Sequence, residues 1–204
     1  QSFKTRYGLK KNVIIYLGQL NGAQYASLAI NAFRTIMKKR NDTSLLVVGG
    51  GSMLDSLKEE AKDIESVVFT GFVKDEEVPL LLDVADIAVA CFEENRITRA
   101  KSPLKIAEYL GSGKAIVASD VGEVPYMIGK AGVLVPPGDS EAIAEACLSL
   151  LSDPARMQKL RMNARKRAEK MFNWEHTAKN MLKSYSFFGQ TPRSSAARYQ
   201  SKKG

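Results

Sequence analysis

The chain has 204 residues, of which 45% are hydrophobic and 25% charged, and its formal net charge is +8. These values are typical of an ordinary globular domain with a substantial core, and no apolar run reaches the roughly 18 residues that a membrane-spanning helix needs. One histidine and the distant Cys91 and Cys147 give no metal-ligand spacing, and we expect buried free thiols in a reducing, cytoplasmic compartment.

Short β-branched runs alternate with segments of helical period along most of the chain. Strands are predicted over 13–18, 44–50, 66–71, 86–91, 114–119 and 131–136. Helical segments are predicted between them, over 25–40, 53–63, 75–85 and 102–111, and three more helices within 139–185. Because the strands are almost continuously apolar, they predict a sheet buried on both faces and therefore parallel. The order predicts a doubly wound, Rossmann-like α/β sheet of about six strands with C-terminal helices.

Positive charge is concentrated in two stretches near the C-terminus. Residues 156–170 are interpreted as the solvated face of a helix, with contact to an anionic membrane surface as the alternative. Residues 186–204 carry four cations and no acidic residue, and their polar, aperiodic sequence predicts a disordered tail. The basic helix has no interleaved aromatic residues and the chain has no recognisable reading motif, so we expect no nucleic-acid partner. The chain starts at Gln1 without a signal peptide, which indicates a processed or excised piece.

Two glycine-rich stretches look like nucleotide-binding motifs but differ from them in order and spacing. GSGK at 111–114 follows a helix and precedes a strand, the reverse of a P-loop, so Gly111 and Gly113 are interpreted as helix C-cap glycines. GGGSML at 49–54 has Leu54 where a dinucleotide fingerprint has its third glycine. We therefore place no phosphate on either stretch.

The start of the helix AKSPLKIAEYL is a better candidate for an anion site. Ser102 is predicted as its N-cap and Pro103 as its first residue. Its first turn contains Lys105 in place of an acid, and Lys101 and Arg99 lie just before it, after the fourth strand. A helix N-terminus among cations suits an anion from solution. Solvated lysines, one of them paired with a glutamate of the same helix, would explain these residues equally well.

A series of segments resembles the C-terminal domain of family 4 glycosyltransferases, which are retaining enzymes of the two-domain GT-B fold. The likeness covers about residues 12–185, in the family's order, through YLGQLNGAQYASLAINAF, LLVVGGG, VVFTGFV, LLDVADIAVA, SPLKIAEYLGSGKAIVASDVG, AGVLVPPGDSEAIAEA and FNW. It implies a nucleotide-sugar-binding domain over 12–185 and a linker or interdomain segment over 1–11. It also implies a partner outside this chain, the N-terminal acceptor domain, which holds most of the catalytic residues. No cofactor or metal is implied.

The resemblance assigns roles to residues near two strand ends. The family's Glu-x7-Glu motif ends in a glutamate that binds the nucleotide ribose, and Glu108 matches it. Ala100 stands where the first glutamate of the motif contacts the donor sugar, so that carboxylate is absent. The loop that packs against the base is matched by Gly71, Phe72, Val73 and Lys74.

The predicted diphosphate contacts depart from the family's pattern. Gly18 matches the glycine of a Gly-Arg-Leu segment, but Gln19 and Gln24 replace the arginine and lysine that neutralise the diphosphate. Neutral amides cannot stabilise the charge that develops on a departing pyrophosphate. We therefore expect that charge to be met at the start of the helix, by the cations Arg96, Arg99, Lys101 and Lys105 and by the backbone around Ser102, Pro103 and Leu104.

The sequence thus predicts the donor-binding half of a hexosyltransferase that moves a sugar from a nucleoside diphosphate sugar, with retention, to a saccharide, lipid-linked or small-molecule acceptor. We expect the isolated domain to bind nucleotide weakly and not to turn over. A sugar-nucleotide epimerase or phosphorylase of the same fold is one alternative. The other is a non-catalytic binding module in which Gln19, Gln24 and Ala100 mark a degenerate site.

Overall fold

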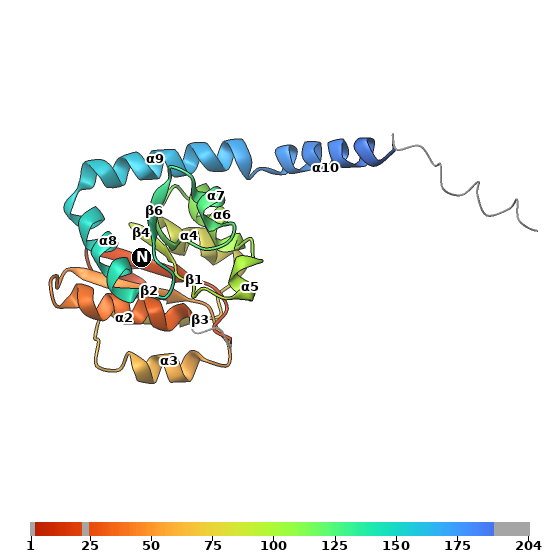
Figure 1. Ribbon diagram of the computed structural model, residues 1–204. Helices are drawn as coiled ribbons and strands as arrows, with labels where there is room; N and C mark the ends of the chain where they lie inside the picture. The colour runs from red at the N-terminus through yellow and green to blue at the C-terminus, as the bar shows by residue number, and fades with distance from the viewer. Residues whose placement is uncertain (1–2, 22–24, 190–204) are drawn as a thin grey trace, which may run out of the picture.

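The computed structural model describes residues 3–21 and 25–189, and a parallel sheet flanked by helices on both faces forms its centre (Figure 1). Six strands pair in the order β3-β2-β1-β4-β5-β6. All five pairings are parallel. The predicted Rossmann-like sheet is confirmed, and its strands are β1 (Asn12–Leu17), β2 (Thr43–Val48), β3 (Val67–Gly71), β4 (Ile87–Ala90), β5 (Ala115–Ser119) and β6 (Gly132–Val135).

Helices cover both faces of this sheet. On one face α2 (Tyr25–Met37) packs against α8 (Ser140–Ser152), and on the other α6 (Leu104–Gly111) packs against α9 (Pro154–Met171). The remaining helical elements are α1 (Phe3–Arg6), α3 (Leu54–Glu60), the 3-10 turn η1 (Asp75–Glu77), α4 (Val78–Asp83), α5 (Arg96–Arg99), α7 (Val124–Ile128) and α10 (Trp174–Gly189).

Burial explains why the central strands read as continuous apolar runs. Every residue of β2, β4 and β5 is buried, because helices cover both sides of these strands. The edge strands β3 and β6 keep most residues partly accessible. The core therefore extends through the whole thickness of the sheet rather than along one face.

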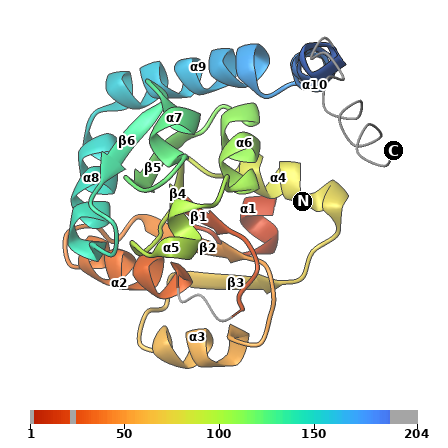
Figure 2. The same ribbon diagram turned by 45° about the vertical axis from the view of Figure 1, so that its right-hand side comes forward.

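The strand order reverses between the neighbouring strands β1 and β4. From β1 it passes to β2 and β3 on one side, and from β4 to β5 and β6 on the other. β1 and β4 pair only through Ile14 with Ile87 and Ile15 with Ala88. A ligand crevice is expected outside the carboxyl ends of such neighbouring strands, where the strand order reverses. Figure 2 turns this edge of the sheet toward the viewer.

The C-terminal helices run along one side of the domain and then beyond it. α9 crosses the domain and α10 continues past the carboxyl edge of the sheet (Figure 1). Since α10 ends at Gly189, helix extends into the first residues of the predicted tail, and residues 190–204 lie outside the described part of the chain. Within the described residues, no helix is both long enough and apolar enough to cross a membrane.

The basic run 156–170 is only partly a solvated face, which corrects our interpretation of it. Arg161 and Arg165 donate hydrogen bonds to the carbonyls of Gly113 and Gly111 at the end of α6. Arg167 donates to backbone carbonyls at the end of α7. Free carbonyls at a helix C-terminus attract cations, so these arginines attach α9 to the two helices it crosses.

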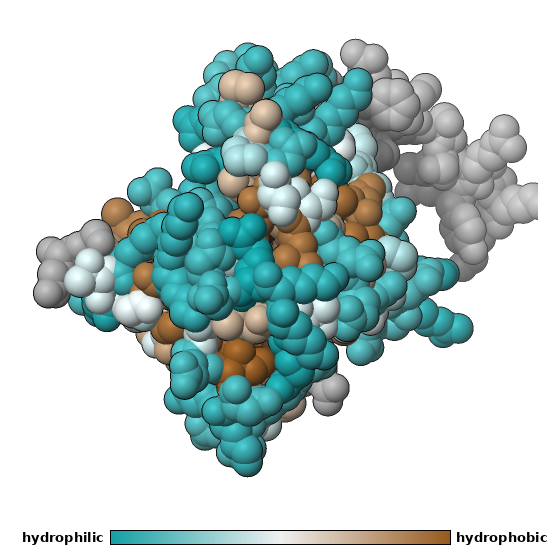
Figure 3. All heavy atoms as spheres, turned by 90° about the vertical axis from the view of Figure 1, so that its left-hand side faces the viewer, coloured by the Kyte–Doolittle hydropathy of each residue, from teal (hydrophilic) through white to brown (hydrophobic). Residues whose placement is uncertain are grey.

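Seen from the left-hand side of Figure 1, the molecule presents a mainly hydrophilic surface with apolar patches between polar side chains (Figure 3). The N-terminal segment, predicted as a linker, carries α1, and its Phe3, Tyr7 and Leu9 are partly buried against the core.

Candidate functional site

The candidate site lies at the carboxyl ends of β1 and β4, where the loops after β1 and β2 are locked together by backbone contacts. The Gly18 amide donates to the Val48 carbonyl at 3.0 Å, and the Leu20 amide to the Gly50 carbonyl at 3.0 Å. A Cβ added at Gly49 would lie 2.0 Å from the Gly18 carbonyl oxygen. The glycine run at 49–51 therefore lets two backbones approach, a packing role that its spacing alone did not reveal.

The amino end of α6 faces this edge, but its cap differs from our prediction. The helix begins at Leu104, and Pro103, with φ −69° and ψ 112°, is the N-cap. Ser102 lies outside the helix, and no side chain caps the first turn. The prediction of Ser102 as N-cap is wrong, because Pro103 is itself extended and shifts the helix start by one residue. The first turn contains no acid, so its amide groups face outward without a carboxylate.

Lys105 lies at the centre of the site. Its Nζ is 4.2 Å from the ring centroid of Tyr16 on β1 and 5.8 Å from that of Phe92, just after β4. The same atom would be 2.7 Å from a Cβ at Gly18, so a side chain there would collide with it. Burial lowers the pKa of Lys105 to about 8. The cation is thus held between two aromatic rings and the backbone of the β1 loop.

Tyr109 sets the position of α6 against the sheet. Its buried hydroxyl accepts a hydrogen bond from the Leu17 amide at 2.8 Å and donates to the Val89 carbonyl at 3.3 Å. The helix is thereby attached to both strands at the reversal point, four residues beyond Lys105 and one beyond Glu108.

Glu108 lies on the same face of α6 as Lys105, as the spacing predicted. Its side chain is half-buried, and burial raises its pKa, while Lys105 lowers it and Asp75 raises it. Within the described residues the two side chains form no ion pair or hydrogen bond with each other, so the alternative of a self-contained pair is not what the structure has. Both groups remain available to a ligand.

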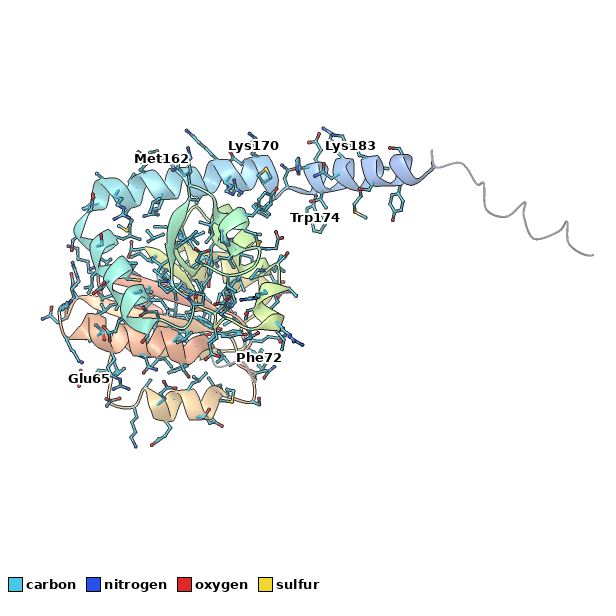
Figure 4. All side chains as sticks on the ribbon, viewed as in Figure 1. Glu65, Phe72, Met162, Lys170, Trp174 and Lys183 are labelled. Atoms are coloured by element: carbon cyan, nitrogen blue, oxygen red, sulfur yellow. The ribbon has the colours of Figure 1, made fainter. Side chains whose placement is uncertain are left out.

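The loop after β3 borders the site on the β2 side. Gly71 has φ +67°, and its carbonyl accepts from the Gly49 amide at 3.2 Å. Phe72 is 80% exposed, and a Cβ at Gly50 would meet its ring at 2.6 Å. Figure 4 shows Phe72 at the outer side of the domain. The predicted base-contacting loop, Gly71, Phe72, Val73 and Lys74, therefore lies next to the glycine run, and Asp75, which follows it, is near enough to Glu108 on α6 to raise its pKa.

The other predicted cations are less central than Lys105. Arg99 forms an ion pair with Glu94 on the surface. Lys101 is exposed, and its Nζ lies 5.6 Å from the ring centroid of Tyr25 at the start of α2. Arg96 is exposed at the start of α5.

Among the uncharged residues predicted to contact the diphosphate, Gln19 is exposed beside Gly18, and Leu104 is 74% exposed on the first turn of α6. Gln24 lies outside the described residues.

The GSGK segment lies at the opposite, amino edge of the sheet. Gly113 has φ +60°, as predicted for a residue that ends a helix, whereas Gly111 is the last residue of α6 and Ser112 its C-cap. Lys114 is 1% exposed, and its Nζ donates to the carbonyls of Asp83 and Ala85, both at 3.1 Å. This lysine holds the α4–β4 connection and is not a phosphate ligand.

Sequence reasoning missed several residues of the site. Tyr16 and Phe92 come from different strands, so no local spacing signals that their rings meet Lys105. α5 was also missed, although its signal was present: Asn95 accepts hydrogen bonds from the amides of Ile97 and Thr98. Cys91 and Cys147 are buried free thiols, as predicted. Within the described residues, no group of three or more His, Cys, Asp or Glu side chains could hold a metal ion.

The fold and the site together define an α/β domain with three ligand-binding features at the carboxyl ends of β1 and β4, where the strand order reverses. These features are the partly buried cation Lys105, the first turn of α6 without an acidic residue, and the half-buried carboxylate Glu108. Such an arrangement suits an anionic ligand that also carries hydroxyl groups. Residues 11–153 match the family described as glycosyl transferases group 1. The chain belongs to this family.

Curated relatives and solved structures agree with this assignment. The chain is 31% identical over 180 residues to the GDP-mannose-dependent alpha-(1-6)-phosphatidylinositol monomannoside mannosyltransferase of Mycolicibacterium smegmatis, covering 84% of this chain and 47% of the relative. It is 30% identical over 189 residues to the D-inositol 3-phosphate glycosyltransferase of Rhodococcus opacus, covering 86% and 41%. The chain spans about half the length of the curated relatives it matches.

Among solved structures, Alr3699/HepE of Anabaena, in complex with UDP and glucose, superposes with a TM-score of 0.76 at 21% identity, covering 90% of this chain and 51% of that one. The C-terminal domain of a glycosyl transferase group 1 family protein from Francisella tularensis gives a TM-score of 0.69 at 23% identity, covering 84% and 93%. These likenesses show a shared Rossmann-like fold.

Proposed function

We propose that this chain is the donor-binding domain of a retaining, family 4 type glycosyltransferase that uses a nucleoside diphosphate sugar. The observation that carries the proposal is the placement of Lys105 and Glu108 on one face of α6, at the reversal point of the sheet. A relative at 31% identity is described as GDP-mannose-dependent, and a solved structure of similar fold holds UDP and glucose. Both descriptions support a nucleotide-sugar ligand.

We assign the diphosphate to the amino end of α6. Lys105 and Lys101 supply positive charge there, and the backbone from Ser102 to Leu104 and around Gly18 and Gln19 supplies hydrogen-bond donors. These cations take the place that a metal would otherwise fill, so we propose metal-independent transfer. Arg99 is the weakest member of this set, because its guanidinium is paired with Glu94.

We assign the ribose to Glu108 and the base to the loop from Gly71 to Lys74. An ionised carboxylate accepts hydrogen bonds from two adjacent hydroxyl groups. The exposed ring of Phe72 offers an apolar surface beside the glycine run, where a planar base can pack.

We further propose that a second domain, which binds the acceptor, covers the carboxyl edge. Apolar side chains are exposed on this side of the molecule: Phe72 is 80%, Ile97 66% and Leu104 74% exposed. Trp174, 89% exposed, points from α10 toward the side on which the sheet lies, whereas Lys183 points away from it (Figure 4). Exposed apolar residues gathered on one side favour an interdomain contact. We place the reaction in the cytoplasm, in keeping with the free thiols.

A nucleotide-protection experiment tests this proposal. Thermal unfolding is followed with UDP, GDP and ADP at millimolar concentration, and at least one of them is expected to raise the melting temperature of the wild-type chain. Lys105→Met should abolish the shift, and Lys166→Met, on the outer side of α9, should retain it. Absence of any shift with the wild type supports the non-catalytic module with a degenerate site.

The reaction itself is tested on a protein that contains both halves. Incubation with the nucleotide sugar that protects best is expected to release nucleoside diphosphate and to give a glycoside with retained anomeric configuration, read by NMR. Formation of an epimeric sugar nucleotide, or of a sugar phosphate, would instead identify the epimerase or phosphorylase alternative.

A further inference from the structure

The ammonium group of Lys105 has no hydrogen-bond acceptor within the described part of the chain. Its neighbours are the ring of Tyr16 at 4.2 Å, the ring of Phe92 at 5.8 Å and the Cα side of Gly18. A lysine ammonium carries three donors, and aromatic faces attract the charge without satisfying those donors. The site therefore holds a cation whose hydrogen bonds are left for a ligand or solvent.

This feature sets Lys105 apart from the cations around it. Arg99 is neutralised by Glu94, and Lys101 is exposed to solvent beside Tyr25. Lys114, which is buried at the amino edge of the sheet, donates to two backbone carbonyls. Lys105 alone among these residues is partly buried and has no acceptor among the described residues.

Four titratable groups face Lys105 from the elements packed around it. Cys91, after β4, and Glu108, on α6, favour its charged form, while Lys101 opposes it. Tyr16, on β1, contributes its ring face. Burial exceeds these influences and lowers the pKa of Lys105 to about 8. Cys91 and Tyr16 do not titrate near that value, because burial raises the pKa of the Cys91 thiol to about 12 and raises the pKa of the Tyr16 phenol well above its ordinary value.

We propose that Lys105 is the residue through which the donor's diphosphate binds with uptake of a proton. In the free domain a fraction of the side chain is a neutral amine above neutral pH. When the diphosphate arrives, the amine nitrogen accepts one proton from the solvent, an N–H bond forms, and the resulting ammonium donates to phosphate oxygens. No other bond forms or breaks. This inference rests on the proposed function and names the residue that couples donor binding to pH.

The coupling has a definite sign. A bound dianion raises the pKa of the neighbouring lysine, so the complex holds more protons than the free domain, and affinity falls as pH rises past about 8. If the complex stays protonated throughout, the dissociation constant should rise about 25-fold between pH 7.5 and 9.5. The terminal phosphate is fully ionised across this window, since its second pKa is near 6.

Isothermal titration calorimetry of the chain tests the proposal, with UDP, GDP and ADP as probes. Titrations between pH 7.5 and 9.5, each in two buffers of different ionisation enthalpy, give affinity and proton uptake together. We expect the dissociation constant to rise about 25-fold across this pH range. Proton uptake on binding should approach one proton per site at the highest pH. Lys105→Arg should bind with a flat profile, because a guanidinium stays charged. Lys166→Arg, at an exposed position of α9, is the matched control and should keep the wild-type slope.

Three results would overturn the inference. One is a flat wild-type profile, and another is a slope that persists in Lys105→Arg. Because arginine could be excluded from the space between Tyr16 and Phe92, Lys105→Met is measured as well, and unchanged affinity in that variant is the third. If no probe binds to the wild type at any pH, the proposed donor site itself fails. Binding without pH dependence refutes only the role of Lys105.

Discussion

Two lysines, one at each edge of the sheet, make opposite use of burial. At the amino edge Lys114 is almost inaccessible, and its ammonium is paired with the carbonyls of Asp83 and Ala85. At the carboxyl edge Lys105 lies between two aromatic rings and no described group accepts its hydrogen bonds. Burial lowers the pKa of both. The accompanying acceptors, rather than burial itself, distinguish a lysine that holds the fold from one that is free to bind a ligand.

The largest loss of stability should come from Gly49, a residue at the carboxyl edge with a purely structural role. It would show that neighbouring glycines at this edge tolerate substitution very differently. Gly49→Ala should cost about 3–4 kcal/mol of unfolding free energy, because φ is +132° and the new Cβ would lie 2.0 Å from the Gly18 carbonyl oxygen. Gly50→Ala is the matched control. The three atoms nearest to its added Cβ all belong to the exposed ring of Phe72, which can swing away, so it should cost under about 1 kcal/mol in urea unfolding. Equal losses of unfolding free energy in the two variants would contradict the explanation that Gly49 is needed for the close approach of the backbone at Gly18.

The amino-edge lysine should show the next largest effect. Lys114→Met retains the length of the side chain but leaves the Asp83 and Ala85 carbonyls without their donor, at a cost of about 2–3 kcal/mol. Chemical denaturation measures this loss. Nucleotide protection of the folded variant should match that of the wild type, and a binding defect at full folding would contradict the separation of the two edges.

Lys105→Met should act in the opposite direction on stability. The lowered pKa of Lys105 means that its charge destabilises the folded state fully below pH 8, and that this penalty disappears as pH rises toward 10.5, the ordinary value. The variant should therefore be more stable than the wild type by about 1–2 kcal/mol at pH 7, after the lost cation–π contact is allowed for.

The size of that gain should shrink between pH 8 and 10.5, and denaturation series at several pH values measure it. A gain that does not change with pH would indicate simple repacking rather than removal of a buried charge. Loss of donor protection together with a gain in stability would mark Lys105 as a residue kept for binding.

The smallest effect tests the helix start. Ser102→Ala should change the unfolding free energy by less than about 0.5 kcal/mol, because Ser102 lies outside α6 and caps none of its amides. A true N-cap serine would cost about 1 kcal/mol. Asn95→Ala, which removes the observed cap of α5, is the control that should show that larger loss.

The strands were predictable from the sequence because a sheet covered on both faces leaves runs of apolar residues, as in β2 and β4. The placement of Glu108 and Lys105 on one helix face followed from helical period alone. The surroundings of Lys105 did not, since Tyr16 and Phe92 are distant in sequence and meet it only through sheet pairing. The close approach of Gly49 to Gly18 likewise depends on how two loops fold together.

The hydroxyl of Tyr109 has a consequence for how the site responds to a ligand. β1 and β4 pair directly at only two positions, and beyond them the phenolic oxygen joins the Leu17 amide to the Val89 carbonyl. A side chain of α6 thus bridges the two strands where they no longer pair directly. The separation of β1 and β4 and the position of α6 therefore depend on each other. Binding groups on α6 cannot drift without breaking two buried hydrogen bonds, so the site is preorganised and a ligand pays little for ordering it.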